Sequence, residues 1–199
     1  MMGPRRQRLL LVTVVALSAC VKPPVYNYAA EPDPRKAEYV IGVGDTIQIN
    51  VWKTGELNTT GTVRPDGIIT MPLVGDLKAS GKTPSQLKVE ITERVSLYIK
   101  GEAAPVAVAV TGMNSYRWTM QGNFERNGLF TERRYVTVSE AIANAGGVGK
   151  FGNAHKVFLI RRGSDGRLRR IPIDYTRIQG GEHPEEDLVI ITGDVLFAP

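Results

Sequence analysis

Residues 39–51 read YVIGVGDTIQINV, and this stretch decides how the first half of the chain folds. Apolar and polar side chains alternate from Ile47 to Val51, which predicts a half-buried β-strand. The Gly44-Asp45 dipeptide stands just before that strand, and both residue types suit a tight turn. Sequence reasoning therefore places a turn followed by a core strand at the start of the folded region.

The next segment, residues 63–83, reads VRPDGIITMPLVGDLKASGKT. Asp66 and Gly67 separate two short apolar runs and predict a hairpin, and residues 71–77 predict another short strand and turn. A helix is expected after Thr83, because a threonine, a proline and a glutamine occupy its first positions. Its predicted buried stripe is Leu87, Ile91, Val95 and Tyr98. Valines then alternate with small residues over 106–111, which predicts a strand. Because its second face is also small and mostly apolar, both faces of this strand could be covered by other elements.

The second half repeats short strands around one helix. Thr137 and Glu140 form a capping box that predicts a helix over 138–145, and Gly146 and Gly147 are expected to end it. Strands are predicted over 116–122, 156–162, 167–173, 188–191 and 195–197, with Gly193 and Asp194 in the turn before the last. The predicted fold class is α+β, with two small mixed domains.

The N-terminus looks like a bacterial lipoprotein signal. Residues 1–8 carry three arginines, residues 9–16 are almost entirely apolar, and Ser18 and Ala19 precede Cys20, the only cysteine. The apolar run is far short of the roughly 20 residues that span a bilayer. We therefore expect a signal peptide at 1–19 and a lipidated, palmitate-bearing Cys20. Val21 after the cysteine favours the outer membrane by analogy with enteric sorting.

Charge excludes one class of function. Residues 1–19 hold three basic and no acidic side chains, so 22 basic and 20 acidic side chains remain after cleavage. A nearly neutral mature chain gives no support to nucleic-acid binding. Prolines at 23, 24, 32 and 34 predict an extended tether over 20–37.

The two quoted stretches resemble the polysaccharide biosynthesis/export family, the Wza-type outer-membrane proteins. The turn residues of these motifs, with expected structural roles, are Gly44, Asp45, Asp66, Gly67, Pro72 and Gly75. Residues 121–122, 137–147, 157–162 and 193–199 separately resemble the β-grasp domain of the same family, with Gly146, Gly147, Gly193 and Asp194 as its turn residues. The resemblance implies an export domain over 38–113 and a soluble-ligand-binding (SLBB) β-grasp domain over 114–199. Asn127-Gly128 and Thr192-Gly193-Asp194 depart from the common motifs but keep a glycine in each turn.

Family resemblance also implies a function. The expected protein is a periplasm-facing lipoprotein that forms a homo-oligomeric ring, an octamer by family analogy, through which capsular polysaccharide or exopolysaccharide passes. An inner-membrane copolymerase is the expected partner. No helix with a wide apolar stripe follows Pro199, so we expect a separate outer-membrane partner such as a β-barrel. The alternative is a monomeric, lipid-tethered module that binds glycan or peptidoglycan.

Sequence reasoning finds no catalytic set, metal site or cofactor motif. His155 and His183 lack ligand spacing, and the repeated Gly-Asp dipeptides are better explained as turns. A solvated loop is the expected state of Glu185-Glu186-Asp187. Trp52 and Trp118 either stack on sugar rings or pack in a core or subunit interface. The basic hairpin from Arg161 to Arg170 is either solvated or in contact with an acidic glycan or a neighbouring subunit.

Overall fold

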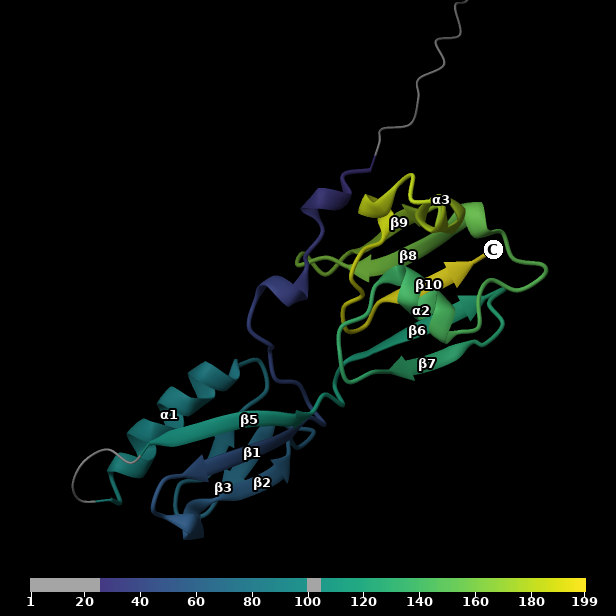
Figure 1. The fold of residues 1–199 in the computed structure, drawn as a ribbon. Coiled ribbons are helices and arrows are strands. Elements are labelled where there is room, and N and C mark those ends of the chain that lie inside the picture. Colours follow the sequence, from purple (N-terminus) through teal and green to yellow (C-terminus); the bar gives the residue numbers. More distant parts are fainter. Residues whose placement is uncertain (1–25, 100–104) are drawn as a thin grey trace, which may run out of the picture.

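The computed structural model describes residues 26–99 and 105–199, which form two lobes with separate hydrophobic cores (Figure 1). Helices and sheets occur in both lobes, so the predicted α+β class is confirmed. The predictions for the signal peptide and Cys20 lie outside the described residues. Within the described ranges, no helix has both the length and the apolar character needed to cross a membrane.

The first lobe contains a three-stranded antiparallel sheet, a hairpin and one long helix. Its strand order is β2-β1-β5, and β3 pairs with β4. The elements are β1 (Thr46–Val51), β2 (Thr59–Thr62), β3 (Ile68–Met71), β4 (Gly75–Lys78), α1 (Pro84–Ser96) and β5 (Val106–Gly112), with a short 3-10 helix at Gly55–Leu57. The predicted alternation in β1 is confirmed, because Ile47, Ile49 and Val51 are buried.

Helix α1 begins as predicted. Thr83 accepts a hydrogen bond from the Gln86 amide, and the Gln86 side chain accepts one from the Thr83 amide. Leu87, Ile91 and Val95 are buried in the first core. Tyr98, predicted in the same stripe, is 55% exposed because the helix ends at Ser96.

Strand β5 is covered on one face only. Val106 is buried, whereas the small residues that alternate with the valines are exposed. The expectation that both faces of this strand are covered is therefore wrong, and the outer face of the first sheet is exposed to solvent.

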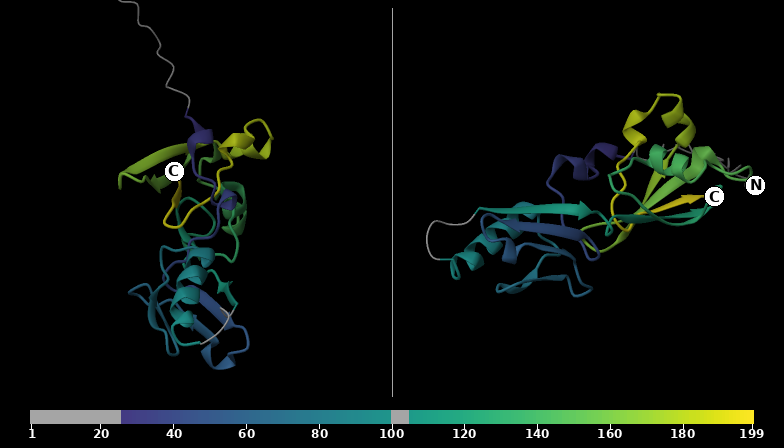
Figure 2. Two further views of the ribbon diagram at one scale, coloured as in Figure 1. Left: turned by 90° about the vertical axis from the view of Figure 1, so that its left-hand side faces the viewer. Right: turned by 60° about the horizontal axis from the view of Figure 1, so that its bottom comes forward.

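The second lobe has a mixed five-stranded sheet in the order β7-β6-β10-β8-β9. Strand β10 is parallel to β6 and antiparallel to β8. The elements are β6 (Arg117–Gly122), β7 (Gly128–Thr131), α2 (Val138–Asn144), β8 (Val157–Arg162), β9 (Leu168–Ile173), α3 (Tyr175–Gln179) and β10 (Val195–Ala198), with short 3-10 helices at Ala154–Lys156 and Pro184–Glu186. Figure 2 shows the helices gathered on one side of this sheet.

Two expectations for the second lobe fail. Residues 188–191 do not form a strand, because Val189 makes only an isolated bridge to Thr137. The short helix α3, which Asp174 caps, was not predicted. The capping box at Thr137 and the hairpin of β8 and β9 are both confirmed.

The segment before the first lobe is not an extended tether over its described part. It forms 3-10 helices at Tyr28–Ala30 and Pro34–Lys36, and it runs beside the second lobe (Figure 1). Tyr26 and Tyr28 pack against the second core, and the Tyr28 hydroxyl donates to the Pro172 carbonyl at 2.8 Å. Contacts of Tyr26 and Tyr28 with the second lobe thus hold in place a segment that its proline content alone predicts to be an extended spacer.

Candidate functional site

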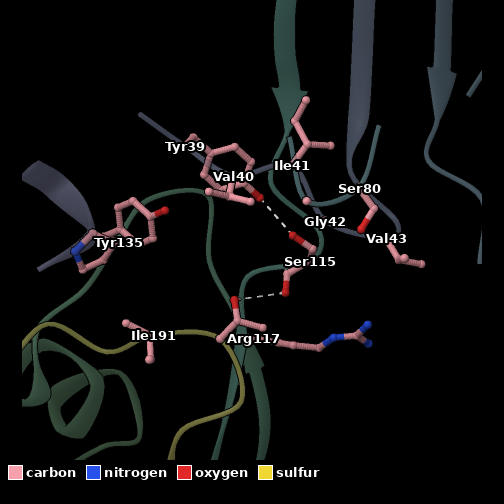
Figure 3. A pocket seen from close by; sticks show the side chains of 13 residues that line it. Tyr39, Val40, Ile41, Gly42, Val43, Ser80, Ser115, Arg117, Tyr135 and Ile191 are labelled. Atoms are coloured by element: carbon pink, nitrogen blue, oxygen red, sulfur yellow. Dashed lines mark hydrogen bonds between the residues drawn. The ribbon is translucent and has the colours of Figure 1, made fainter. Parts of the chain in front are cut away.

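A pocket of 520 Å³ lies at the junction of the two lobes (Figure 3). Residues 113–116 join β5 to β6 and form the connector between the lobes. The pocket is lined by Tyr39, Ile41 and Ser80 from the first lobe, Ser115 from the connector, and Arg117, Tyr135 and Thr192 from the second lobe. The stretch 39–51, which predicts the first core strand, therefore also contributes residues to the junction.

Asp45 fastens the connector between the lobes. Its buried carboxylate accepts hydrogen bonds from the Gly42 amide at 2.7 Å, the Ser115 amide at 2.8 Å and the Tyr39 hydroxyl at 2.6 Å. Gly44 turns the chain into β1 with a φ of 91°, a conformation that glycine adopts without strain. The interpretation of Gly44-Asp45 as a structural turn is confirmed, and the structure adds its role in holding the lobes together.

Three tyrosines extend this junction. Tyr39 lies 6.3 Å from Tyr135 between ring centroids, and Tyr135 lies 5.1 Å edge-on from Tyr116. The Tyr116 hydroxyl donates to the Ile190 carbonyl and accepts from the Val136 amide, both at 3.1 Å. Burial raises the pKa of Tyr116 to about 12, and burial together with the Asp45 carboxylate raises the pKa of Tyr39 as well. These hydroxyls are therefore protonated hydrogen-bonding groups at neutral pH.

A second buried aspartate holds the N-terminal segment. Asp194 accepts from Arg161 Nη2 at 2.6 Å and from the Ile191 amide at 2.9 Å. Arg161 Nη1 in turn donates to Glu31 at 3.1 Å, and the side chains of Arg161, Asp194 and Glu31 are each 1% exposed. The Gly193-Asp194 turn is thus linked through Arg161 to a residue 130 positions away in the sequence.

The solvated interpretation of the basic hairpin is wrong for Arg161, which is buried. Arg169 donates to Glu31 at 3.0 Å, and the Arg170 guanidinium lies 3.6 Å from the centroid of the Phe158 ring. Alternation along the hairpin cannot reveal that an acidic residue from the N-terminal segment meets two of these arginines.

The remaining motif residues lie in turns or at the start of a strand. Asp66 accepts from the Ile68 amide, and the Gly67 carbonyl accepts from the Ala79 and Ser80 amides. Gly67 has a φ of 79°, and a Cβ there would come within 2.8 Å of the Ser80 Cβ, so both backbone conformation and space favour glycine. Pro72 lies in the turn between β3 and β4, Gly75 is the first residue of β4, and Gly146 and Gly147 follow α2.

The third Gly-Asp dipeptide differs from the other two. Asp76 is exposed on β4 and accepts from the Thr70 hydroxyl at 2.6 Å, with Arg64 at 3.4 Å. The Thr70 hydrogen bond, more than the Arg64 charge, lowers the pKa of Asp76. The dipeptide is therefore not one repeated functional unit.

The tryptophans and acidic loop are now placed. Trp118 is 1% exposed in the second core, whereas Trp52 is 64% exposed. Glu186 is buried and accepts from the Asp174 amide at 2.7 Å, so the solvated-loop interpretation is wrong for that residue.

Neither histidine belongs to a metal cluster. His155 meets Asp174 at 3.1 Å and His183 meets Glu185 at 2.7 Å. Among the described residues, no group of three or more histidine, cysteine, aspartate or glutamate side chains is placed to hold a metal ion.

The junction thus combines a pocket of 520 Å³ with one buried structural carboxylate, that of Asp45. Residues 33–111 match the family described as polysaccharide biosynthesis/export protein. Both motifs quoted for the first lobe fall inside this matched region, so the predicted resemblance to the family is confirmed there.

Named relatives agree with the family. The chain is 30% identical over 133 residues to the exopolysaccharide production protein ExoF of Rhizobium meliloti (strain 1021), covering 61% of this chain and 31% of ExoF. It is 28% identical over 137 residues to the polysialic acid transport protein KpsD of Escherichia coli, covering 64% and 23%. It is 27% identical over 195 residues to the EPS I polysaccharide export outer membrane protein EpsA of Ralstonia solanacearum, covering 79% and 51%. The chain thus spans about half or less of the length of these relatives.

Proposed function

We propose that this protein is a component of an outer-membrane export machinery for capsular polysaccharide or exopolysaccharide. The observation that carries the proposal is the family match over residues 33–111. The names of relatives from three organisms, which refer to exopolysaccharide production, polysialic acid transport and polysaccharide export, support it.

The proposal divides the chain into an export domain over 38–113 and an SLBB-like β-grasp domain over 114–199. Support for the second domain comes from its sheet. Numbered within the domain, the strands lie in the order second, first, fifth, third, fourth, and the first and fifth are parallel. Helix α2 connects the second and third strands, and the shorter α3 lies between the fourth and fifth.

Lipidated Cys20 is the proposed membrane attachment, on the periplasmic side of the outer membrane. Glu31 is only 11 residues from Cys20 and is fixed to the second lobe by Arg161. An extended chain of that length reaches at most about 40 Å. The proposal therefore keeps the second lobe close to the bilayer. Replacement of Cys20 by alanine is expected to release the protein into the soluble periplasmic fraction, and retention would argue against lipid anchoring.

The conduit itself is proposed to be a ring of identical subunits above an inner-membrane copolymerase. Head-to-tail contacts between wedge-shaped subunits form a closed ring when the rotations from each subunit to the next add up to a full turn. The alternative is a monomeric glycan- or peptidoglycan-binding module. Light scattering of the lipidated full chain in detergent separates them: a ring gives a particle of several subunit masses, and a module gives one subunit mass.

A further inference from the structure

The outer face of the first sheet is exposed and uncharged. Residues on β1, β2 and β5 that point away from the core carry hydroxyl, amide or methyl groups: Thr46, Gln48, Asn50, Thr60, Thr62, Ala107, Ala109 and Thr111. Charged residues make up 23% of the whole chain, so a sheet face without any is a distinct surface. We call these eight residues the neutral face.

Trp52 stands at one end of the neutral face and is 64% exposed. Its backbone is held in place, because its amide donates to the Pro105 carbonyl at 2.9 Å. The neighbouring Val51 amide donates to the Asn58 side chain at 2.8 Å. Lys53, which follows, has a φ of 59°, a left-handed conformation that is unfavourable for a long side chain. The backbone around Trp52 is therefore hydrogen-bonded on both sides, and its indole ring is exposed to solvent.

A pocket of 380 Å³ adjoins this tryptophan. Asn50 and Ala107 of the neutral face line it, together with Trp52, Lys53 and Asn58. Among the residues that the structure describes, its lining includes one cationic side chain and no carboxylate. An aromatic ring, two amides and a cation at one end of a neutral polar surface are complementary to a sugar ring that carries hydroxyls and an acidic group.

We propose that Trp52, Lys53 and Asn50 form a binding subsite for one residue of an anionic polysaccharide. The indole stacks on the apolar face of the sugar ring, the Asn50 amide meets its hydroxyls, and the Lys53 ammonium meets its carboxylate. This inference rests on the proposed export function and names the chemistry of its substrate. The neutral face beyond the pocket offers only weak hydrogen bonds, which suits a polysaccharide that must be released and pass along the surface.

The two tryptophans make the subsite directly measurable. Trp118 is in the second core, so the solvent-exposed part of the emission comes from Trp52. The detergent-solubilised full chain is titrated with tri-galacturonic acid and, separately, with maltotriose as a neutral trisaccharide. We expect the acidic sugar to quench or blue-shift the exposed emission saturably, and maltotriose to bind more weakly.

Three variants give the controls. Trp52→Phe should abolish the response and leave the Trp118 emission unchanged. Lys53→Gln should weaken binding of the acidic sugar roughly twofold to fivefold, as expected for an exposed charge pair, and remove its advantage over maltotriose. Lys150→Gln removes a lysine beside another exposed aromatic, Phe151, and should have no effect.

Two results would overturn the subsite. One is an absence of any sugar-dependent change in Trp52 emission. The other is an emission change that follows protein concentration and particle mass instead of sugar, which would make Trp52 a subunit contact. Trp52→Phe is expected to leave particle mass unchanged, so failure of the subsite is distinguishable from failure of the export function.

Discussion

Glu31 and Arg161 lie 130 positions apart in the sequence and form an ion pair at 3.1 Å in which each side chain is 1% exposed. Asp194 completes the neutralisation of Arg161 from the other side. Burying a guanidinium is tolerated only with such partners, because an unpaired buried charge is costly. Glu31, in the described part of the N-terminal segment, is therefore anchored to the folded second lobe.

Replacing Glu31 by glutamine should destabilise the protein. The buried Arg161 would lose one of its two carboxylate partners, and we expect the free energy of unfolding to fall by about 3 kcal/mol. Urea denaturation followed by circular dichroism measures the change. Asp33→Asn is the matched control, because its partner Arg35 is largely exposed and the pair should contribute less than about 1 kcal/mol. Equal effects of the two substitutions would contradict the role given to Glu31.

Asp45→Asn tests the junction between the lobes. Asparagine presents a donor group to amides and hydroxyls that themselves donate to Asp45, so several charge-assisted hydrogen bonds are lost. A loss of roughly 3 kcal/mol in urea denaturation is expected. Asp76→Asn is the control: it changes the aspartate of another Gly-Asp dipeptide, at an exposed position, and should cost no more than about 1 kcal/mol. A junction that tolerated Asp45→Asn as well as Asp76→Asn would not depend on this carboxylate.

Alkaline pH should destabilise the protein through one buried and two partly buried tyrosines. The pKa values of Tyr26, Tyr28 and Tyr116 are each raised from 10.0 to about 12, with burial as the largest cause. Between these pH values the unfolded chain loses protons that the native protein keeps, so stability is intact below pH 10 and falls as the pH rises towards 12.

Tyr116→Phe isolates one of these groups. It should cost about 1–3 kcal/mol near neutral pH, because the Ile190 carbonyl and the Val136 amide lose their partner. It should also reduce the alkaline decline in stability by up to about 1.4 kcal/mol per pH unit. Urea denaturation at several pH values measures both effects. An unchanged alkaline slope would show that Tyr116 does not contribute to the decline.

Leu73→Asn should stabilise the protein. Leu73 has a φ of 60° in the turn between β3 and β4 and is 69% exposed, so it bears strain without burying its side chain. Asparagine tolerates the left-handed conformation better, and we expect a gain of about 1 kcal/mol. Leu97→Asn is the control, because Leu97 is 80% exposed with a right-handed φ of −72° and should change little. A loss of stability at position 73 would contradict the strain argument.

Local sequence signals predicted most of the fold. The capping boxes at Thr83 and Thr137 act within four residues, and alternation in β1 reports directly on one buried face. The turn roles of Gly44-Asp45 and Gly193-Asp194 were also predictable, because their amide partners are nearby in sequence.

Long-range partners could not be predicted in the same way. Burial of Arg161 depends on Glu31, and the role of Asp45 at the junction depends on Ser115, 70 residues away. Residues 188–191 are apolar enough for a strand, yet Ile190 fills the second core from a loop, and its carbonyl bonds to Tyr116. Trp52 could be separated from Trp118 only once the structure gave their exposures.

The most direct test of the export function is a clean deletion of the gene, with and without complementation by the full chain. Surface polysaccharide is measured on intact cells, and polymer and its precursors are measured inside them. The account predicts that deletion abolishes the surface polysaccharide while intracellular material accumulates, and that the full chain restores export. Unchanged surface polysaccharide in the deletion strain would contradict it.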